Sequence, residues 1–204
     1  MYLTNAASDD LRILPTHRLV RQLPDSWDGE RLLTELAVYF TILPKTDVEE
    51  LPELLHGRRH AFGLYLPGGA AYKLRLRPEL AAQVPWPMPE VVRSLDLTLL
   101  HYYVLEKVLG VPGPRQRGWA GISYVRGLAE CVRQVEQGEA AAAFLTGEVT
   151  MAEVEAVCRS GAVMPPKSTF FYPKVLGGLL FASVADEAPS VFDSVFWEGK
   201  EVRK

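Results

Sequence analysis

The sequence of 204 residues predicts an α/β (α+β) fold in which helices pack on a mixed β-sheet. Runs typical of helices and of strands alternate through the second half of the chain, which favours helices laid against a sheet. A β-hairpin near 61–76 is indicated by two strand-like runs that flank Pro67-Gly-Gly-Ala70, whose glycines can adopt the positive φ angles of a tight turn. Hydrophobic residues make up 48% of the chain, which is enough for a sizeable core.

The remaining elements are predicted from turn residues and apolar spacing. Before the hairpin we expect a strand at 11–14 that Pro15 ends, and then a helix at 31–40. A second strand at 39–43 and a short capped helix at 47–57 follow. After it we expect a rigid proline-rich connector at 84–89, a long helix at 94–109 and a loop at 111–118. A strand at 121–125, a helix at 128–137 and a strand at 140–145 follow. A capped helix at 150–159 and a last strand at 179–184 complete the expected elements.

The domain organisation follows from these elements. Residues 1–185 are predicted to form a single α/β domain. Residues 186–204 are rich in charge and lack strong periodicity, so we expect either a short docking helix or a disordered tail.

Composition excludes several classes of function. A net charge of −3 argues against a general nucleic-acid binder, which is usually basic. Cys131 and Cys158 make neither a disulfide framework nor a metal motif, and no pair of side chains has metal-ligand spacing, so no metal site is predicted. The sequence shows no membrane span and no signal peptide, which favours a cytoplasmic protein.

The segment Gly161–Lys174 carries the strongest chemical signal. Two adjacent prolines precede Lys167-Ser-Thr169, and Lys174 follows, so that cations and hydroxyls suited to a phosphate stand behind a stiff backbone. A P-loop is rejected because Pro166 occupies the position of that loop's second glycine, which proline geometry cannot replace. The alternative is a loop whose lysines simply reach solvent.

Charge patterning supports an anion site. Residues 107–129 and 156–185 contain no Asp or Glu, although the chain is acidic overall. Folding that brought these stretches together would create a local positive field to which Arg115 and Arg117 contribute. We therefore predict that the segment 164–174 faces either Pro15–Arg18 or Arg115–Arg117 across one concave surface.

The segment Pro15–Arg18 is a second candidate. It is interpreted as a rigid turn that presents Thr16 as a hydroxyl, His17 as a general base and Arg18 as a bidentate clamp for an anion. The alternative is that Thr16 caps a helix and His17 binds a backbone carbonyl. His101 is interpreted as a core histidine.

Several of these motifs together resemble a known family. They are Leu14-Pro-Thr-His-Arg-Leu19, Leu95-Asp-Leu-Thr-Leu-Leu-His101, Ile122-Ser-Tyr124, and above all Met164-Pro-Pro-Lys-Ser-Thr-Phe-Phe-Tyr-Pro-Lys174 with Gly178-Leu179. In this order they are similar to the C-terminal half of the domain-of-unknown-function 1015 family.

The resemblance implies an activity. Members of the family are thought to include ATP-dependent kinases of free L-serine, which implies ATP and Mg as cofactors and a small-molecule substrate. The family's N-terminal half carries an Asp-Gly-His-His-Arg block that this sequence lacks. The resemblance therefore implies a partner, either the missing N-terminal half or a second copy. The alternative function is a non-catalytic regulatory or oligomerisation module, and nucleic acid is an unlikely partner.

Overall fold

The computed structural model describes Asn5, Ser8 and residues 11–174. By its internal contacts the chain divides into two units, Met1–Tyr172 and Pro173–Lys204. The fold described below is that of the first unit. The strand expected at 179–184 and the tail 186–204 lie outside the described residues.

The centre of the fold is a six-stranded sheet with the order β3-β5-β4-β7-β2-β6. Its strands are β2 (His17–Val20), β3 (Phe40–Lys45), β4 (Ala61–Leu66), β5 (Ala70–Leu76), β6 (Ile122–Val125) and β7 (Ala142–Thr146). Two further strands, β1 (Arg12–Leu14) and β8 (Phe170–Tyr172), pair with each other as a separate antiparallel ribbon.

The predicted fold class is confirmed, but the sheet is antiparallel rather than mixed in every described pairing. The strands β6 and β7, which flank a helix in the sequence, do run parallel to each other. However, β2 lies between them and is antiparallel to both. Alternation along the sequence predicted a mixed sheet, but it could not show that an early strand is inserted between these two.

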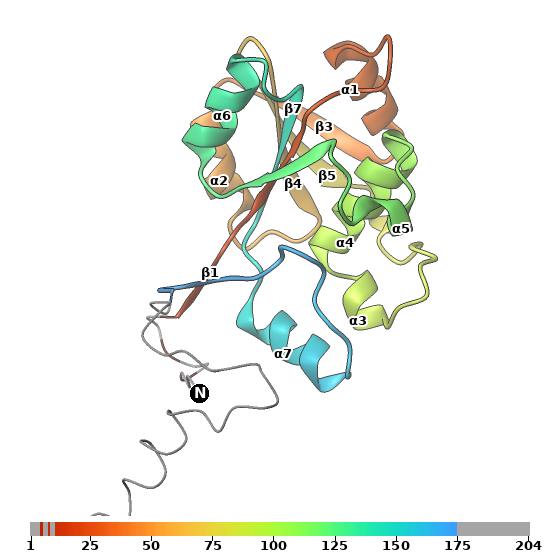
Figure 1. Cartoon of the computed structure of the whole chain (residues 1–204), viewed down its shortest axis with the longest axis vertical. Helices are drawn as coiled ribbons and strands as arrows, with labels where there is room; N and C mark the ends of the chain where they lie inside the picture. The colour runs from red at the N-terminus through yellow and green to blue at the C-terminus, as the bar shows by residue number, and fades with distance from the viewer. Residues whose placement is uncertain (1–4, 6–7, 9–10, 175–204) are drawn as a thin grey trace, which may run out of the picture. The chain divides into compact units, whose positions relative to one another are not determined.

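Helices cover both faces of the sheet, as Figure 1 shows. The helices α2 and α6 lie on one side, and α1, α4 and α5 lie on the other. The helical segments are α1 (Gly29–Ala37), α2 (Leu51–Leu55), α3 (Glu90–Arg93), α4 (Asp96–Leu100), a π-helix (His101–Val108), α5 (Gly113–Gln116), α6 (Leu128–Glu136), α7 (Met151–Arg159) and the 3₁₀ turns Val48–Glu50 and Pro78–Leu80.

Each face of the sheet has its own core. On the α1 side, Val20, Phe40, Phe62, Leu64 and Phe144 belong to one apolar cluster with the π-helix. On the α2 and α6 side, a second cluster forms from Leu19, Leu51, Leu55, Tyr65, Cys131, Val135 and Leu145. Adjacent residues of a strand therefore point into different cores, as the two-residue period of a strand requires.

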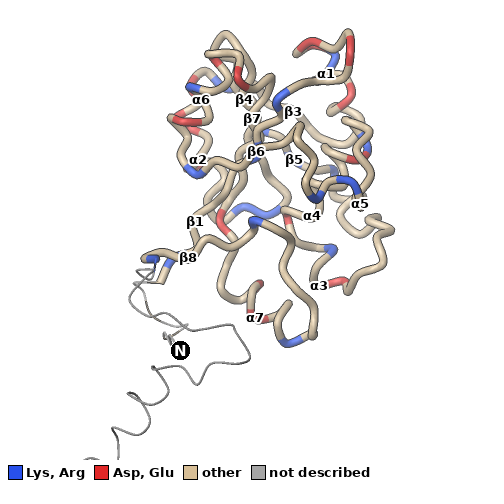
Figure 2. The backbone as a smooth tube through the Cα atoms, viewed as in Figure 1, with Lys and Arg blue, Asp and Glu red and all other residues tan. Residues whose placement is uncertain are grey.

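Local signals in the sequence are confirmed where they were strongest. The hairpin turn has Gly68 and Gly69 at φ values of 79° and 81°. The α7 helix begins with a complete capping box, in which Thr150 and Glu153 exchange side-chain hydrogen bonds to each other's amide groups. Charged side chains of both signs lie next to each other along α6 (Figure 2), where Arg133 pairs with Glu130 and Glu139.

Two predictions need correction. The segment 111–118, expected to be a loop, contains the short helix α5, which Pro112 and Pro114 permit because a first-turn position needs no intrahelical N–H donor. The long helix expected at 94–109 is α-helical only to Leu100 and continues as the π-helix.

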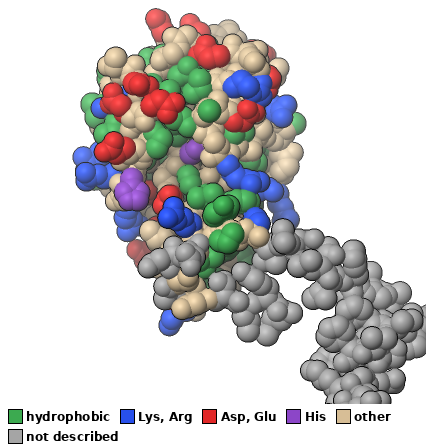
Figure 3. Space-filling model, turned by 90° about the vertical axis from the view of Figure 1, so that its left-hand side faces the viewer, with side chains coloured by type: hydrophobic (Ala, Val, Ile, Leu, Met, Phe, Trp, Pro, Cys, Tyr) green, Lys and Arg blue, Asp and Glu red, His purple; other side chains and the backbone are tan. Residues whose placement is uncertain are grey.

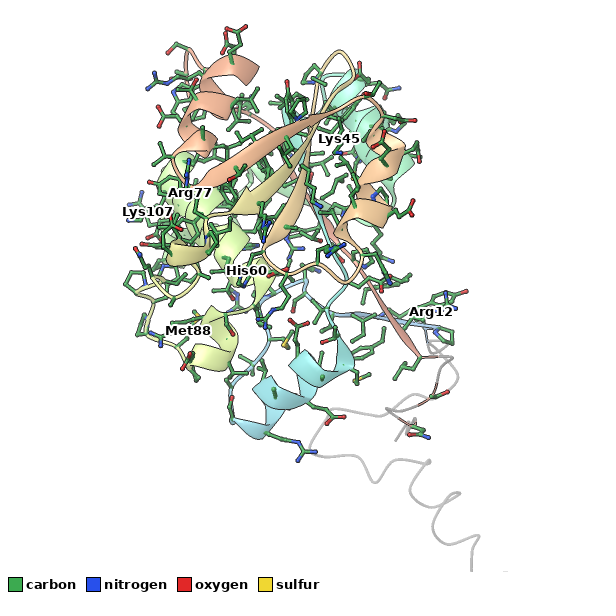
Figure 4. All side chains as sticks on the ribbon, turned by 180° about the vertical axis from the view of Figure 1, so that it is seen from behind. Arg12, Lys45, His60, Arg77, Met88 and Lys107 are labelled. Atoms are coloured by element: carbon green, nitrogen blue, oxygen red, sulfur yellow. The ribbon has the colours of Figure 1, made fainter. Side chains whose placement is uncertain are left out.

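Where α4 begins, Asp96 accepts a hydrogen bond from the main-chain N–H of His60 at 2.9 Å. Figure 4 shows His60 at this junction of sheet and helices.

Candidate functional site

The predicted turn at Pro15–Arg18 is mostly the start of the inner strand β2. Because side chains alternate along a strand, His17 and Arg18 lie on opposite faces of the sheet. His17 lines a cavity with residues of α2 and α6, whereas Arg18 contacts His101 and Tyr124 on the other face. The two side chains were expected to act together, and the strand geometry separates them.

Arg18 is a buried cation held by neutral groups. Its side chain is 1% exposed, and its Nε–H donates to Nε2 of His101 at 3.4 Å. The Nη1 atom donates to the carbonyl of Thr16, and Nη2 donates to the carbonyl of Lys167 at 3.4 Å. The guanidinium also lies over the ring of Tyr124, 5.5 Å from its centroid. None of the ion pairs between described residues includes Arg18.

Burial lowers the pKa of Arg18 to about 10, so the guanidinium stays protonated at neutral pH. Its neighbour His101 is neutral, because burial and then the charge of Arg18 lower the pKa of that imidazole to about 3. A protonated arginine therefore donates to an uncharged histidine, and the positive charge is retained inside the fold without a described carboxylate beside it.

The tautomer of His101 follows from Gln116. The amide nitrogen of Gln116 donates to the carbonyls of His101 and Val111, at 3.1 and 2.9 Å. Its oxygen is therefore the group that faces Nδ1 of His101, at 3.1 Å, and Nδ1 must carry the proton. This leaves the lone pair on Nε2 to accept from Arg18. His101 is thus a hydrogen-bonded core histidine, as its place on the helix predicted.

The Lys167-Ser-Thr169 segment is fixed by its own backbone. The carbonyl of Lys167 accepts from Arg18, and Lys167 adopts a positive φ of 59°, which a residue with a side chain rarely does. The hydroxyl of Ser168 donates to the carbonyl of Pro165 at 2.5 Å, and Ser168 is 3% exposed. Ser168 therefore shapes the loop, while the side chain of Lys167 is exposed and that of Thr169 is half-buried.

The other predicted site residues are distributed differently. Arg115 and Arg117 are exposed on either side of Gln116, whose side chain is buried against His101. Thr16 is buried, and its carbonyl accepts hydrogen bonds from Arg18 and from the hydroxyl of Thr146. Lys174 is exposed and belongs to the second unit. The segment 164–174 therefore reaches β2 through the hydrogen bond from Arg18 to the carbonyl of Lys167. The shared phosphate site stays a prediction.

A cavity of about 230 Å³ lies at the end of the sheet, between α2 and α6. It is lined by Pro15, His17, Pro52, Leu55, His56, Arg126, Leu128, Leu145, Thr146, Gly147 and Glu148. Figure 3 looks at the molecule from this side and shows histidine side chains close to basic and apolar ones.

His17 and Thr146 are the buried polar residues of the cavity wall. Nδ1 of His17 faces the main-chain N–H of Thr146 at 3.3 Å and accepts that hydrogen. Burial, and then the neighbouring charge of Arg18, lower the pKa of His17 to about 4, so the ring is neutral at pH 7. The single ring proton is therefore on Nε2, and His17 presents a hydrogen-bond donor on that side.

Sequence reasoning missed the residues that complete this cavity. His56, Arg126 and Glu148 lie at its exposed rim, and each comes from a different loop. Arg126 also lies over the ring of Phe170, 3.7 Å from its centroid, and so connects the cavity to the segment 164–174. This contact joins the two acid-free stretches, which were the signal in the sequence that pointed towards Arg126.

Comparison with protein families gives one match. The family described as "Protein of unknown function (DUF1015)" matches residues 1–98, which confirms the resemblance predicted from the sequence. The matched span does not include the segment 164–174. A comparison with curated proteins finds no match.

Several solved structures are similar to the chain. "Conserved hypothetical protein from Pyrococcus furiosus" is 14% identical, with 83% of this chain and 60% of that chain covered and a TM-score of 0.46. "Free serine kinase in complex with AMP" is 16% identical, with 83% and 57% covered and a TM-score of 0.47. A mutant of free serine kinase in complex with ADP is 18% identical, with the same coverage and a TM-score of 0.43. The chain spans 57–60% of the length of these structures.

Among residues 11–174 no group of three or more His, Cys, Asp or Glu side chains is arranged to hold a metal ion. Within the same part of the chain, no helix combines the length and the apolar character that crossing a membrane requires.

Proposed function

We propose that the chain is the phosphate-binding part of a cytoplasmic, ATP-dependent kinase that acts on free L-serine. The observation that supports this is the hydrogen bond from Arg18 to the carbonyl of Lys167, because it holds together the two segments whose residues suit a phosphate. Two prolines stiffen the backbone before Lys167, which lowers the entropy lost when a ligand binds. The family resemblance supplies the reaction class.

The predicted residues then divide into two roles. The side chain of Lys167 and the hydroxyl of Thr169 contact phosphate, with Arg115 and Arg117 adding positive charge. Lys174, predicted for the same role, belongs to the second unit. The buried residues Thr16, Arg18 and Ser168 hold the two segments in position.

His17 is reassigned from a general base to a hydrogen-bond donor. Its Nδ1 lone pair is occupied by the amide of Thr146, and its Nε2 carries the proton. A neutral imidazole in this state has no free lone pair with which to take a proton from a hydroxyl. A base for the acceptor hydroxyl is therefore a group other than His17.

Phosphoryl transfer depends mainly on positioning the reactants and on neutralising charge. We propose that the remaining groups come from the N-terminal half that the family resemblance implies, or from a second copy of the chain. Within the described part of the chain, no cluster of His, Cys, Asp or Glu side chains is arranged to hold the Mg ion that ATP implies. The ion would therefore bind together with the nucleotide.

Thermal unfolding of the full chain with ATP and Mg tests the proposal. A ligand that binds only the folded state at 100 times its Kd stabilises it by about 2.7 kcal/mol. We expect ATP or ADP to raise the Tm, and Lys167→Ala to abolish this rise. The control is Lys45→Ala, which removes an equal charge from β3 and should leave the rise unchanged. An unchanged Tm at millimolar nucleotide contradicts the proposal.

The alternative, a non-catalytic docking module, predicts an exposed apolar face of several hundred Å². Within the described residues the large apolar side chains with high exposure are Val38, Leu43, Val163 and Tyr172, which come from three separate segments. No described feature favours this alternative over the kinase proposal.

A further inference from the structure

The N-terminus of α6 opens next to the cavity. This helix has nine residues, and its N-cap is Gly127, which has no side chain to accept a hydrogen bond. The first intrahelical hydrogen bond runs from Cys131 N–H to the carbonyl of Gly127 at 3.1 Å. The N–H groups of Leu128, Ala129 and Glu130 have no hydrogen-bond partner within the described part of the chain. Such groups, together with the helix dipole, favour a negative charge.

His17 is a second and independent observation at the same place. It is only 8% exposed, it lines the cavity, and its Nε2–H has no hydrogen-bond partner among residues 11–174. The ring is almost fully buried and lines the cavity, so this donor is open to the cavity and is left for a group bound there. An oxygen atom bound in the cavity would accept this hydrogen.

The charged side chains at the rim indicate the charge of the ligand, and the cavity volume indicates its size. Arg126 lines the cavity and is oriented by its stacking on Phe170. His56, which directly follows α2, also lines the cavity. Glu148 is the acidic residue of the lining, which disfavours a ligand with many negative charges. A volume of about 230 Å³ is below that of most sites for drug-sized molecules, which favours a compact group.

We propose that this cavity binds a compact oxyanion, the phosphate or carboxylate group of a small molecule, at the N-terminus of α6. The groups that would bind it are the amides of Leu128 and Ala129, the Nε2–H of His17 and the guanidinium of Arg126. This site lies on the other face of the sheet from Arg18 and does not depend on the kinase proposal. None of these contacts involves Lys167.

The test is a titration of the full chain with inorganic phosphate and, separately, with acetate, followed by NMR. We expect saturable shifts of the Leu128 and Ala129 amides and of the His17 ring nitrogens with at least one anion. The anion that gives the tighter saturation identifies the kind of group the site takes. If neither anion moves these signals up to its solubility limit, the proposal is overturned.

Substitutions of Gly127 give a matched comparison. A Cβ added there meets nothing within 4 Å, and its φ of −106° suits any residue, so Gly127→Ala should fold and bind normally. Gly127→Asn places a capping oxygen on the same amides without adding charge, so it should weaken anion binding about tenfold or more while leaving the Tm at least as high. Equal binding by the two variants contradicts the proposal.

Lys167→Ala separates this proposal from the kinase proposal. It should leave phosphate or acetate binding at α6 unchanged, whatever its effect on nucleotide binding. If Lys167→Ala removed the α6 shifts and Gly127→Asn did not, the anion would be bound by the 164–174 segment, and the α6 site would be wrong.

Discussion

The Nη2 atom of Arg18 donates a hydrogen bond to the main-chain carbonyl of Lys167 at 3.4 Å, across 149 positions of the sequence. The same guanidinium donates to the carbonyl of Thr16 and to His101. One buried cation therefore connects the inner strand β2, the π-helix and the proline-rich loop. Replacing Arg18 should therefore destabilise all three of these segments.

We predict that Arg18→Met lowers the free energy of unfolding by about 1–3 kcal/mol, because buried acceptors are left without a donor. His101→Met should also destabilise the fold, since Arg18 then loses an acceptor. The double variant should be less destabilised than the sum of the two single variants, by about 0.5–3 kcal/mol. Urea unfolding of all four proteins measures this coupling, and strict additivity would show that the contact contributes nothing.

The backbone of Lys167 gives a second prediction. Its φ of 59° is strained for a residue with a Cβ atom but not for glycine. Lys167→Gly should therefore be more stable than Lys167→Ala by about 1 kcal/mol. At Lys45, in the extended strand β3, the order should reverse, because glycine there is less favourable than alanine by about 0.5–1 kcal/mol. Thermal unfolding of the four variants checks both signs.

The buried histidines make stability depend on pH. The pKa of His17 is lowered to about 4 and that of His101 to about 3, from 6.5 in the unfolded chain. Below pH 6.5 the unfolded state therefore binds protons that the folded state does not. The stability is fully present above pH 6.5 and falls as the pH is lowered, by up to about 1.4 kcal/mol per pH unit for each histidine.

Asp96 opposes part of this loss. Burial raises its pKa from 3.8 to about 6, so the folded state gains a proton first, and stability rises as the pH falls between these values. We predict that His101→Gln makes the loss of stability between pH 6.5 and pH 4 shallower and that Asp96→Asn makes it steeper. Urea unfolding midpoints of each variant, measured from pH 6.5 to pH 4, test both predictions. The matched control is His56→Gln, which replaces an exposed histidine.

Gly121 is predicted to tolerate no side chain. A Cβ there would lie 2.2 Å from Cζ2 of Trp119, so the indole ring would have to move. We expect Gly121→Ala to lower the free energy of unfolding by about 1–3 kcal/mol and to change the tryptophan fluorescence. Gly127→Ala adds the same methyl group where nothing lies within 4 Å, and it should be nearly neutral. A fully stable Gly121→Ala would contradict the packing around Trp119.

The parts of the fold that could be predicted are those specified by neighbouring residues. The hairpin depends on two glycines, and α7 depends on Thr150 and Glu153, so a short window contains the whole signal. The strand β2 is different, because its four residues include His17 and Arg18 and follow a proline. Its burial depends on partners more than a hundred positions away, which no local pattern reports.

The same reasoning applies to the candidate site. Lys167 and Thr169 were predicted as site residues because they follow two prolines in the sequence. His56, Arg126 and Glu148 come from separate loops, and only the sheet brings them to one cavity. The lack of acidic residues in two stretches predicted a local positive field if the stretches came together, and Arg126 and Phe170, one from each stretch, are in contact. It could not predict that His17 would face this cavity while Arg18 faces away.

The position of β2 has a consequence for synthesis on the ribosome. This strand lies between β6 and β7, so its partners are translated more than a hundred residues after it. At about 5–20 residues per second, Val20 leaves the ribosome roughly 6 to 25 s before Thr146 does. Until β6 is synthesised, neither neighbour of Leu19 and Val20 in the sheet is available, and β7 follows later still. The middle of the sheet is therefore assembled last, and the nascent chain depends on chaperones or on its own solubility until then.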